Sequence, residues 1–236
     1  MWVYRDGIYY EKQMKKYNIL GIFTTKFTSE KVLQRILQAY EIKKLITAYQ
    51  THSKIIKFVN KDDVYSEPQK STVVNPWFGV YYKCDGFITN KENIGLCIRV
   101  ADCVPLFFHD VDRNIVGIVH AGWRGIVKGI IEKCIDCIKR LNLEKNKILF
   151  YIGPHICKKC YEFRNKEIGK KFIYGYRNGY LSLKDEIKMR LLIKGLPEEN
   201  IKSSKFCTYH NNDEFFSYRR GDKEKRIFTI ISKLKK

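Results

Sequence analysis

The chain has 236 residues, enough for one sizeable domain with a full hydrophobic core or for two small domains at most. Its content of 44% hydrophobic and 14% aromatic residues is typical of a globular protein and argues against intrinsic disorder. The formal net charge of +20 is spread along the whole chain, and no known nucleic-acid-binding module accompanies it. We therefore interpret the charge as a solvated basic surface that attracts phosphate or other small anions, and we disfavour nucleic acid as a partner.

Residues 1–16 contain no apolar run and no small-residue cleavage site of the secretory kind, and the longest apolar runs are too short to cross a bilayer. We expect a cytoplasmic protein with no membrane partner. The eight cysteines are then expected as reduced thiols, some packed in the core and some available for metal.

The N-terminal half predicts a hairpin, a helix and then several short strands. Asp6-Gly7 between two aromatic-rich runs predicts a type I′ hairpin turn, and Ser29 is a good N-cap for a helix with apolar spacing up to Tyr40. Residues 60–76 are polar and predict a loop. Apolar or β-branched runs predict strands over 19–25, 45–50, 54–59, 87–89, 94–100, 104–109 and 115–119.

The C-terminal half predicts two helices and three strands. Residues 125–141 form the longest amphipathic pattern, and a second helix is expected to begin at Ser182. Strands are expected over 147–152, 205–209 and 226–231. Helices and strands are mixed without strict alternation, which favours an α+β fold in a single domain spanning residues 1–236.

Three polar residues that follow predicted strands are candidates for chemistry. His52 follows the strand at 45–50, and Cys103 lies close to Pro105, where we expect the chain to turn or bulge. His120 opens a Gly-rich junction into the long helix, where free N–H groups can face an anion. From the residues alone each could equally be structural, because their separation matches no short-range metal-binding pattern.

Six segments, taken in order, resemble the YfiH family, also called the laccase-domain or multicopper polyphenol oxidoreductase family. They are Gln50-Thr51-His52, Cys84-Asp85-Gly86-Phe87-Ile88-Thr89, Ala101-Asp102-Cys103-Val104-Pro105, His120-Ala121-Gly122-Trp123-Arg124-Gly125, Ile152-Gly153-Pro154 with Tyr161-Glu162, and Cys207-Thr208 with Phe216-Ser217-Tyr218-Arg219-Arg220. The resemblance implies mixed β-sheets in a four-layer α/β/β/α arrangement, related to the cytotoxic necrotizing factor toxins. The chain departs from the family at Thr24-Thr25-Lys26, where a Gly-rich loop is usual.

The resemblance also implies that His52, Cys103 and His120 bind one metal ion. We expect zinc, with copper able to replace it in vitro. Three protein ligands leave a fourth position for water or substrate, which is the catalytic pattern. Asp85 is a candidate to orient one of the histidines and to act in catalysis beside Cys103, His120 and Arg124. Four-copper oxidase chemistry is excluded because it needs roughly ten histidines and the chain has five.

In function, the resemblance implies a purine nucleoside phosphorylase. Such an enzyme converts adenosine, inosine and methylthioadenosine, with phosphate, to the base and ribose 1-phosphate, and has adenosine deaminase activity besides. Arg124 and the backbone at Gly122 are the first candidates for phosphate, and Arg219 and Arg220 the second. Gln50 and Trp123 are further candidates for substrate contact, although Trp123 could equally serve packing and each Arg could form an ion pair.

Two alternatives and one cysteine pattern stay open. The same residues could serve a Cys-His amidohydrolase or deamidase, with Cys103 as nucleophile and His120 as base, or a hydrolase that edits peptidoglycan precursors. Separately, the pairs Cys134/Cys137 and Cys157/Cys160 have zinc-ribbon spacing. Because Cys134 lies on the apolar face of the long helix, we favour core or idle thiols over a second zinc or a disulfide.

Overall fold

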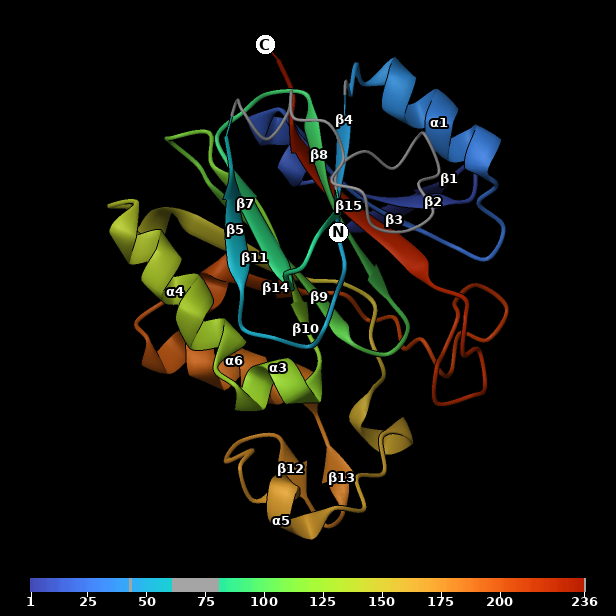
Figure 1. Cartoon of the computed structure of the whole chain (residues 1–236), viewed down its shortest axis with the longest axis vertical. Coiled ribbons are helices and arrows are strands. Elements are labelled where there is room, and N and C mark those ends of the chain that lie inside the picture. Colours follow the sequence, from blue (N-terminus) through green and yellow to red (C-terminus); the bar gives the residue numbers. More distant parts are fainter. Residues whose placement is uncertain (43, 61–80, 236) are drawn as a thin grey trace.

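The computed structural model describes residues 1–42, 44–60 and 81–235, with two β-sheets at its centre (Figure 1). The predicted loop at 60–76 falls, apart from Asn60, outside the described residues. In that part of the chain the first sheet has the order β1-β2-β3-β15-β8-β4-β6. Its strands are β1 (Trp2–Arg5), β2 (Ile8–Glu11), β3 (Ile19–Thr24), β15 (Ile227–Lys233), β8 (Ile94–Val100), β4 (Lys44–Ala48) and β6 (Tyr81–Tyr82). β4 pairs parallel with β8 and β6, and the other pairs are antiparallel, so the sheet is mixed.

The second sheet has the order β14-β11-β9-β10-β7-β5 and is also mixed. Its strands are β14 (Ile201–Ser203), β11 (Ile148–Ile152), β9 (Val104–Asp110), β10 (Val116–Ala121), β7 (Gly86–Thr89) and β5 (Ile56–Val59). β11 with β14 and β5 with β7 are the parallel pairs. A small hairpin joins β12 (Tyr176–Arg177) to β13 (Tyr180–Leu181).

Helices lie on both sides of the two sheets (Figure 1). They are α1 (Glu30–Ala39), α3 (Trp123–Val127), α4 (Ile130–Arg140), α5 (Lys166–Gly169) and α6 (Leu183–Ile193), with 3₁₀ turns at Met14–Tyr17, Lys145–Lys147, Lys158–Cys160 and Glu198–Asn200. The Ser29 hydroxyl accepts from the N–H of Val32 at the start of α1, and the Ser182 hydroxyl accepts from Asp185 at the start of α6, so both predicted N-caps are confirmed. In the described part of the chain, no helix has the length and apolar character needed to cross a membrane.

The hydrophobic core divides into three clusters that follow the period-two alternation of the strands. Phe107 of β9 packs between the two sheets, whereas its neighbour Phe108 points to the other face and packs with Ile131 of α4 and Ile187 of α6. A third cluster joins Leu33 of α1 to the outer face of the first sheet. The predicted α+β class with mixed sheets is confirmed.

Two predicted elements are wrong. The helix expected over 125–141 is two helices, because Gly129 adopts a left-handed φ of 88° between α3 and α4, a conformation that costs glycine little. The strand expected over 205–209 is absent; β14 precedes it, and residues from Cys207 onward form a tight turn. The hairpin at Asp6-Gly7 is confirmed, since both residues have positive φ as a type I′ turn requires.

Candidate metal site and active-site cavity

His52, Cys103 and His120 come together at adjacent strand ends and form what we call the open cluster. Their ligand atoms all lie within 4.8 Å of one another, and the Cys103 sulfur is 3.9 Å from Nε2 of His52. His52 follows β4, Cys103 immediately precedes β9, and His120 is the penultimate residue of β10. The structure therefore brings together the three residues that the family resemblance grouped.

Asp85 is the buried anchor of this cluster. Its carboxylate is fully buried and accepts a hydrogen bond from Nδ1 of His120 at 2.8 Å. It also accepts from the backbone N–H groups of Thr51, His52 and Ser53 at 3.3, 3.0 and 2.6 Å, and from the Ser53 hydroxyl at 2.7 Å. These bonds fix the loop after β4, in which His52 has a positive φ of 54°. The arrangement leaves Nε2 of His120 available for a metal ion.

Cys103 is positioned by a turn at Asp102 rather than by Pro105. Asp102 has a φ of 85°, while Pro105 lies inside β9 opposite His120, so the predicted turn or bulge at Pro105 is wrong. The Asp102 carboxylate accepts from the Thr208 hydroxyl and from the N–H of Arg219, both at 2.7 Å. The turn that presents Cys103 is thereby tied to the loop before β15.

The ionisation of the open cluster follows from burial opposed by close charges. Burial raises the pKa of Cys103, but the charge of His120 and hydrogen bonds to both histidines outweigh it and lower the pKa to about 6. Burial lowers the pKa of His120, but Cys103 and Asp85 together raise it to about 9. Burial likewise raises the pKa of Asp85, and the bonds from His120 and Ser53 bring it down to about 2. In the metal-free protein these two shifts favour a thiolate at Cys103 beside an imidazolium at His120 around neutral pH.

The donor atoms of the open cluster suit a divalent metal ion, and the space next to them is free for it. One thiolate and two imidazoles are ligands that zinc accepts, and Asp85 supplies the outer hydrogen bond that such histidines need. A Cβ atom at Gly122 would lie 2.6 Å from the Cys103 sulfur and 3.0 Å from Cδ2 of His52. The glycine therefore keeps the space next to the donors free.

A cavity of about 800 Å³ opens beside the open cluster. Its basic lining residues are Arg99, Arg124, Arg219, Lys223 and Arg226, against the acidic Asp102 and Glu224. Aromatic side chains also line it: Tyr49, Trp123, Tyr161 and Tyr218. The positive charge would attract an anion, and the aromatic rings would give a planar base a surface to stack on.

Arg124 and Arg219 both line the cavity with exposed side chains. The Arg124 guanidinium lies 4.3 Å from the ring centroid of Trp123, and that of Arg219 lies 5.1 Å from the ring of Tyr161. Within the described ranges, no carboxylate lies within 4 Å of either one. The helix that begins beside Arg124 has only five residues, so its dipole contributes less than the predicted long helix would.

The other residues predicted to contact substrate or phosphate also make structural contacts. The Gln50 side chain donates to the carbonyl of Arg99 and accepts from its N–H, each at 2.8 Å, so its amide ties β4 to β8 at the cavity wall. Arg220 is not among the cavity residues; its guanidinium binds the Asp222 carboxylate and the carbonyl of Thr208. The Trp123 ring packs edge-on against Phe163 at 5.5 Å.

Sequence reasoning missed three basic residues of the cavity. These are Arg99, Lys223 and Arg226, of which Arg99 has a buried Nε with no hydrogen-bond partner among the described residues. The alternation of β8 could have shown that Arg99 faces away from the hydrophobic cluster between the sheets, but not that it faces a cavity. Lys223 and Arg226 follow the motif that ends at Arg220, and nothing in the sequence around them indicated a cavity.

Only two of the five histidines belong to the open cluster. His109 and His155 are buried elsewhere, where burial lowers the pKa of each to about 4, and His210 lies with three cysteines. A blue-copper site together with a trinuclear copper cluster cannot be assembled from this supply.

Residues 25–233 match the family model described as multi-copper polyphenol oxidoreductase laccase. The chain therefore belongs to this family, also called the laccase-domain or YfiH family. The chain is 32% identical over 226 residues to the Campylobacter jejuni protein named purine nucleoside phosphorylase Cj1217c, covering 92% of this chain and 88% of the relative. It is 30% identical over 165 residues to adenosine deaminase RL5 from an unknown prokaryotic organism, covering 62% of this chain and 61% of that relative.

The fold is also that of a solved relative. The crystal structure of YlmD from Geobacillus stearothermophilus superposes with a TM-score of 0.85 at 23% identity, covering 99% of each chain. Since several curated relatives are named as enzymes, the chain is an enzyme of this family.

Proposed function

We propose that the chain is a zinc-dependent purine nucleoside enzyme. It cleaves adenosine, inosine and methylthioadenosine with phosphate to the free base and the sugar 1-phosphate, and it deaminates adenosine. The names of the relatives support this substrate class. The observation that carries the proposal is a cluster of three metal donors, rather than four, on the wall of a basic and aromatic cavity.

The roles of the residues follow from their places around the cavity. His52, Cys103 and His120 hold the ion, and Asp85 keeps His120 in one tautomer and orientation. A zinc ion bound by these three donors would supply a Lewis acid with one free coordination position.

Phosphorolysis needs an anion held against the sugar of the nucleoside. Arg124 and Arg219 would bind phosphate, and the rings of Trp123 and Tyr161, against which these guanidinium groups lie, would give the purine aromatic surface. A hydrogen phosphate oxygen then forms a bond to C1′ as the bond between C1′ and N9 breaks, and the leaving purine takes the proton that the phosphate gives up. The basic lining stabilises the negative charge that these groups share in the transition state.

Product analysis tests this proposal directly. The purified enzyme is incubated with adenosine in the presence and absence of phosphate, and adenine, inosine and hypoxanthine are measured. We expect adenine only when phosphate is present and inosine in both cases. No turnover of adenosine, or of inosine assayed in the same way, with or without phosphate would contradict the proposal, and turnover of a muramoyl precursor assayed beside them would favour the peptidoglycan-editing alternative.

A Cys-His amidohydrolase is the second candidate, because the metal-free open cluster holds a thiolate beside an imidazolium. The two functions differ in what the Cys103 sulfur binds. In zinc-replete protein we expect iodoacetamide to alkylate Cys103 slowly, and removal of zinc to accelerate the reaction. Fast alkylation of zinc-replete protein, with loss of activity, would favour the amidohydrolase.

A further inference from the structure

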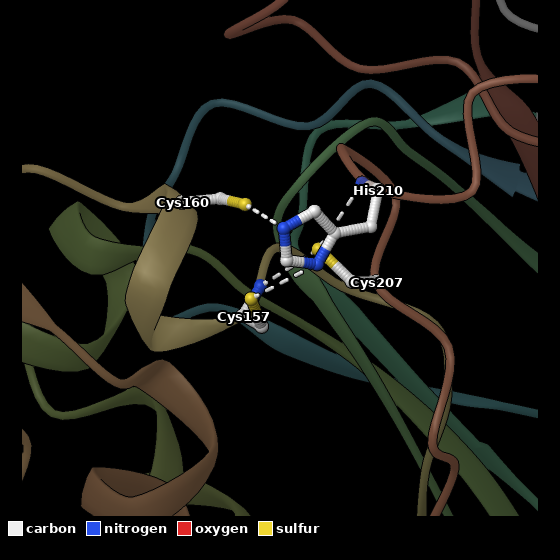
Figure 2. Close-up of side chains that lie close together, drawn as sticks. All are labelled: Cys157, Cys160, Cys207 and His210. Carbon is white, nitrogen blue, oxygen red and sulfur yellow. Dashed lines mark hydrogen bonds between the residues drawn. The ribbon is translucent and has the colours of Figure 1, made fainter.

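A second group of metal donors lies outside the open cluster. We propose that Cys157, Cys160, Cys207 and His210 bind a second zinc ion, a structural one that joins the two loops forming one wall of the cavity. We call these four residues the closed cluster. Their ligand atoms all lie within 4.8 Å of one another. Figure 2 shows the three sulfur atoms gathered around the imidazole ring of His210.

The closed cluster is built from two tight turns. Cys157 caps the 3₁₀ turn Lys158–Cys160 and Cys160 is its last residue, while Cys207 begins the turn that ends near His210. A parallel β-bridge between His155 and Cys207 holds the turns side by side, with the N–H of Thr208 donating to the carbonyl of His155 at 3.1 Å. Two facing turns of this kind, each with donors three positions apart, are the usual frame of a zinc site.

The donor separations are close to those found around a tetrahedral zinc ion. Nε2 of His210 is 3.1 Å from the Cys160 sulfur, and its Nδ1 is 3.7 Å from the Cys157 sulfur. Donors of one tetrahedral zinc, at about 2.0–2.3 Å from the metal, are themselves separated by roughly 3.5–4 Å. The 3.7 Å separation already lies in this range, whereas the Cys160 sulfur and the imidazole would have to move apart from 3.1 Å when one ring nitrogen binds the ion.

Backbone groups already point at one of the sulfurs. The N–H of Cys157 lies 3.2 Å from the Cys207 sulfur, and the N–H of His210 lies 3.5 Å from it. Such bonds orient a thiolate ligand and stabilise its charge. Three thiolates with one zinc ion leave a net charge of −1, and Lys158 and Lys159 between the first two cysteines offset it.

Core packing does not explain this cluster. Cys157 and Cys160 are only partly buried and His210 is exposed, whereas Cys134, on α4, is fully buried in the hydrophobic core. The zinc-ribbon pairing of Cys134/Cys137 with Cys157/Cys160 is therefore not formed; Cys157/Cys160 meet Cys207 and His210 instead. A disulfide between two of the cysteines would leave the third thiol and the imidazole without a role.

The closed cluster also has a structural connection to the cavity. Tyr161, which follows Cys160, lines the cavity, and Thr208, which follows Cys207, donates to the carboxylate of Asp102 beside Cys103. The N–H of Ile156 donates to the carbonyl of Asp102 at 3.1 Å. An ion that clamps the two turns would thus hold both the cavity wall and the turn that presents Cys103.

Zinc content per chain, measured by elemental analysis of protein purified under reducing conditions, tests the proposal. We expect two zinc ions in the wild type, one in Cys160→Ser, one in His52→Ala, and two in the matched thiol control Cys137→Ser. A single ion that is lost in His52→Ala and kept in Cys160→Ser would overturn the second site without touching the proposed function. A single ion with the opposite behaviour would support the second site and contradict the zinc of the open cluster.

Cobalt substitution of the wild type gives a test that does not depend on how a variant folds. Two cobalt ions per chain with a strong near-ultraviolet thiolate band, from four Co–S bonds in all, are expected. A weak band that corresponds to one Co–S bond, or a mass that shows a Cys157–Cys160 disulfide in freshly reduced protein, would overturn the proposal.

Discussion

The open and closed clusters contain similar donors in different surroundings. The open cluster has three donors on a cavity wall and a buried carboxylate that holds one of its histidines, whereas the closed cluster has four donors on two turns. Donor number decides whether a zinc site keeps a free position, so the first arrangement suits catalysis and the second suits structure. The number of ligands and the free space beside them therefore separate the two roles better than residue type does.

Removing a donor of the open cluster is expected to have the largest effect on turnover. In Cys103→Ala the loss of a Lewis acid worth several kcal/mol should lower kcat/KM for both reactions on the order of a thousandfold. Cys137→Ala, which removes a thiol from neither cluster, should keep wild-type rates. Near-normal phosphorolysis by Cys103→Ala would show that the open cluster is not catalytic.

The next effect concerns the carboxylate behind the open cluster. Asp85→Asn replaces an acceptor of five hydrogen bonds by a side chain that cannot accept all of them, so His120 and the loop at His52 lose their anchor. We expect zinc affinity at the open cluster, measured by competition with a chelator, to fall about 10- to 100-fold. The exposed Asp136→Asn is the control, and equal affinity in both variants would refute this role of Asp85.

A smaller and more selective effect is expected at Arg124. A charge-assisted contact is worth about 1.5–3 kcal/mol, so Arg124→Ala should raise the KM for phosphate by roughly tenfold or more. Deamination of adenosine without phosphate should keep its rate, as should both reactions in Arg140→Ala at the exposed end of α4. Loss of both reactions to the same extent in Arg124→Ala would assign the residue to the nucleoside rather than to phosphate.

The smallest effect on turnover is expected from the closed cluster. Cys160→Ser should lower the melting temperature, because an ion present at 1,000 times its Kd stabilises the folded state by about 4 kcal/mol. Turnover should fall less than in Cys103→Ala, because the cavity wall at Tyr161 and the turn at Asp102 loosen while the three donors of the open cluster remain. A melting temperature equal to that of Cys137→Ser would contradict a structural ion.

The sequence predicted the open cluster but not the closed one, and the reason is physical. Each open-cluster residue follows or precedes a recognisable strand, which made it a candidate, and the resemblance of the surrounding motifs to a known family implied that the three act together. The closed cluster depends on which turns meet, and that is set by the parallel pairing of β11 with β14 and by the bridge at Cys207. A strand was predicted where the second turn forms, which hid the Cys207-x-x-His210 spacing.

For the fold, too, local signals were predicted well and features set by long-range packing were not. Local signals such as Asp6-Gly7, Ser29 and Ser182 predicted their turns and caps, because each acts within a few residues. The break in the long amphipathic pattern was missed because a glycine inside a helix is ordinarily tolerated at modest cost. At Gly129 the left-handed φ of 88° separates α3 from α4.

Anomalous diffraction at the zinc edge, from crystals of the wild-type enzyme, tests the two-site account most directly. The account predicts two peaks per chain, one within bonding distance of His52, Cys103 and His120 with a fourth ligand that is not protein, and one surrounded by the four side chains of the closed cluster. A single peak, or a fourth protein ligand at the open cluster, would contradict it.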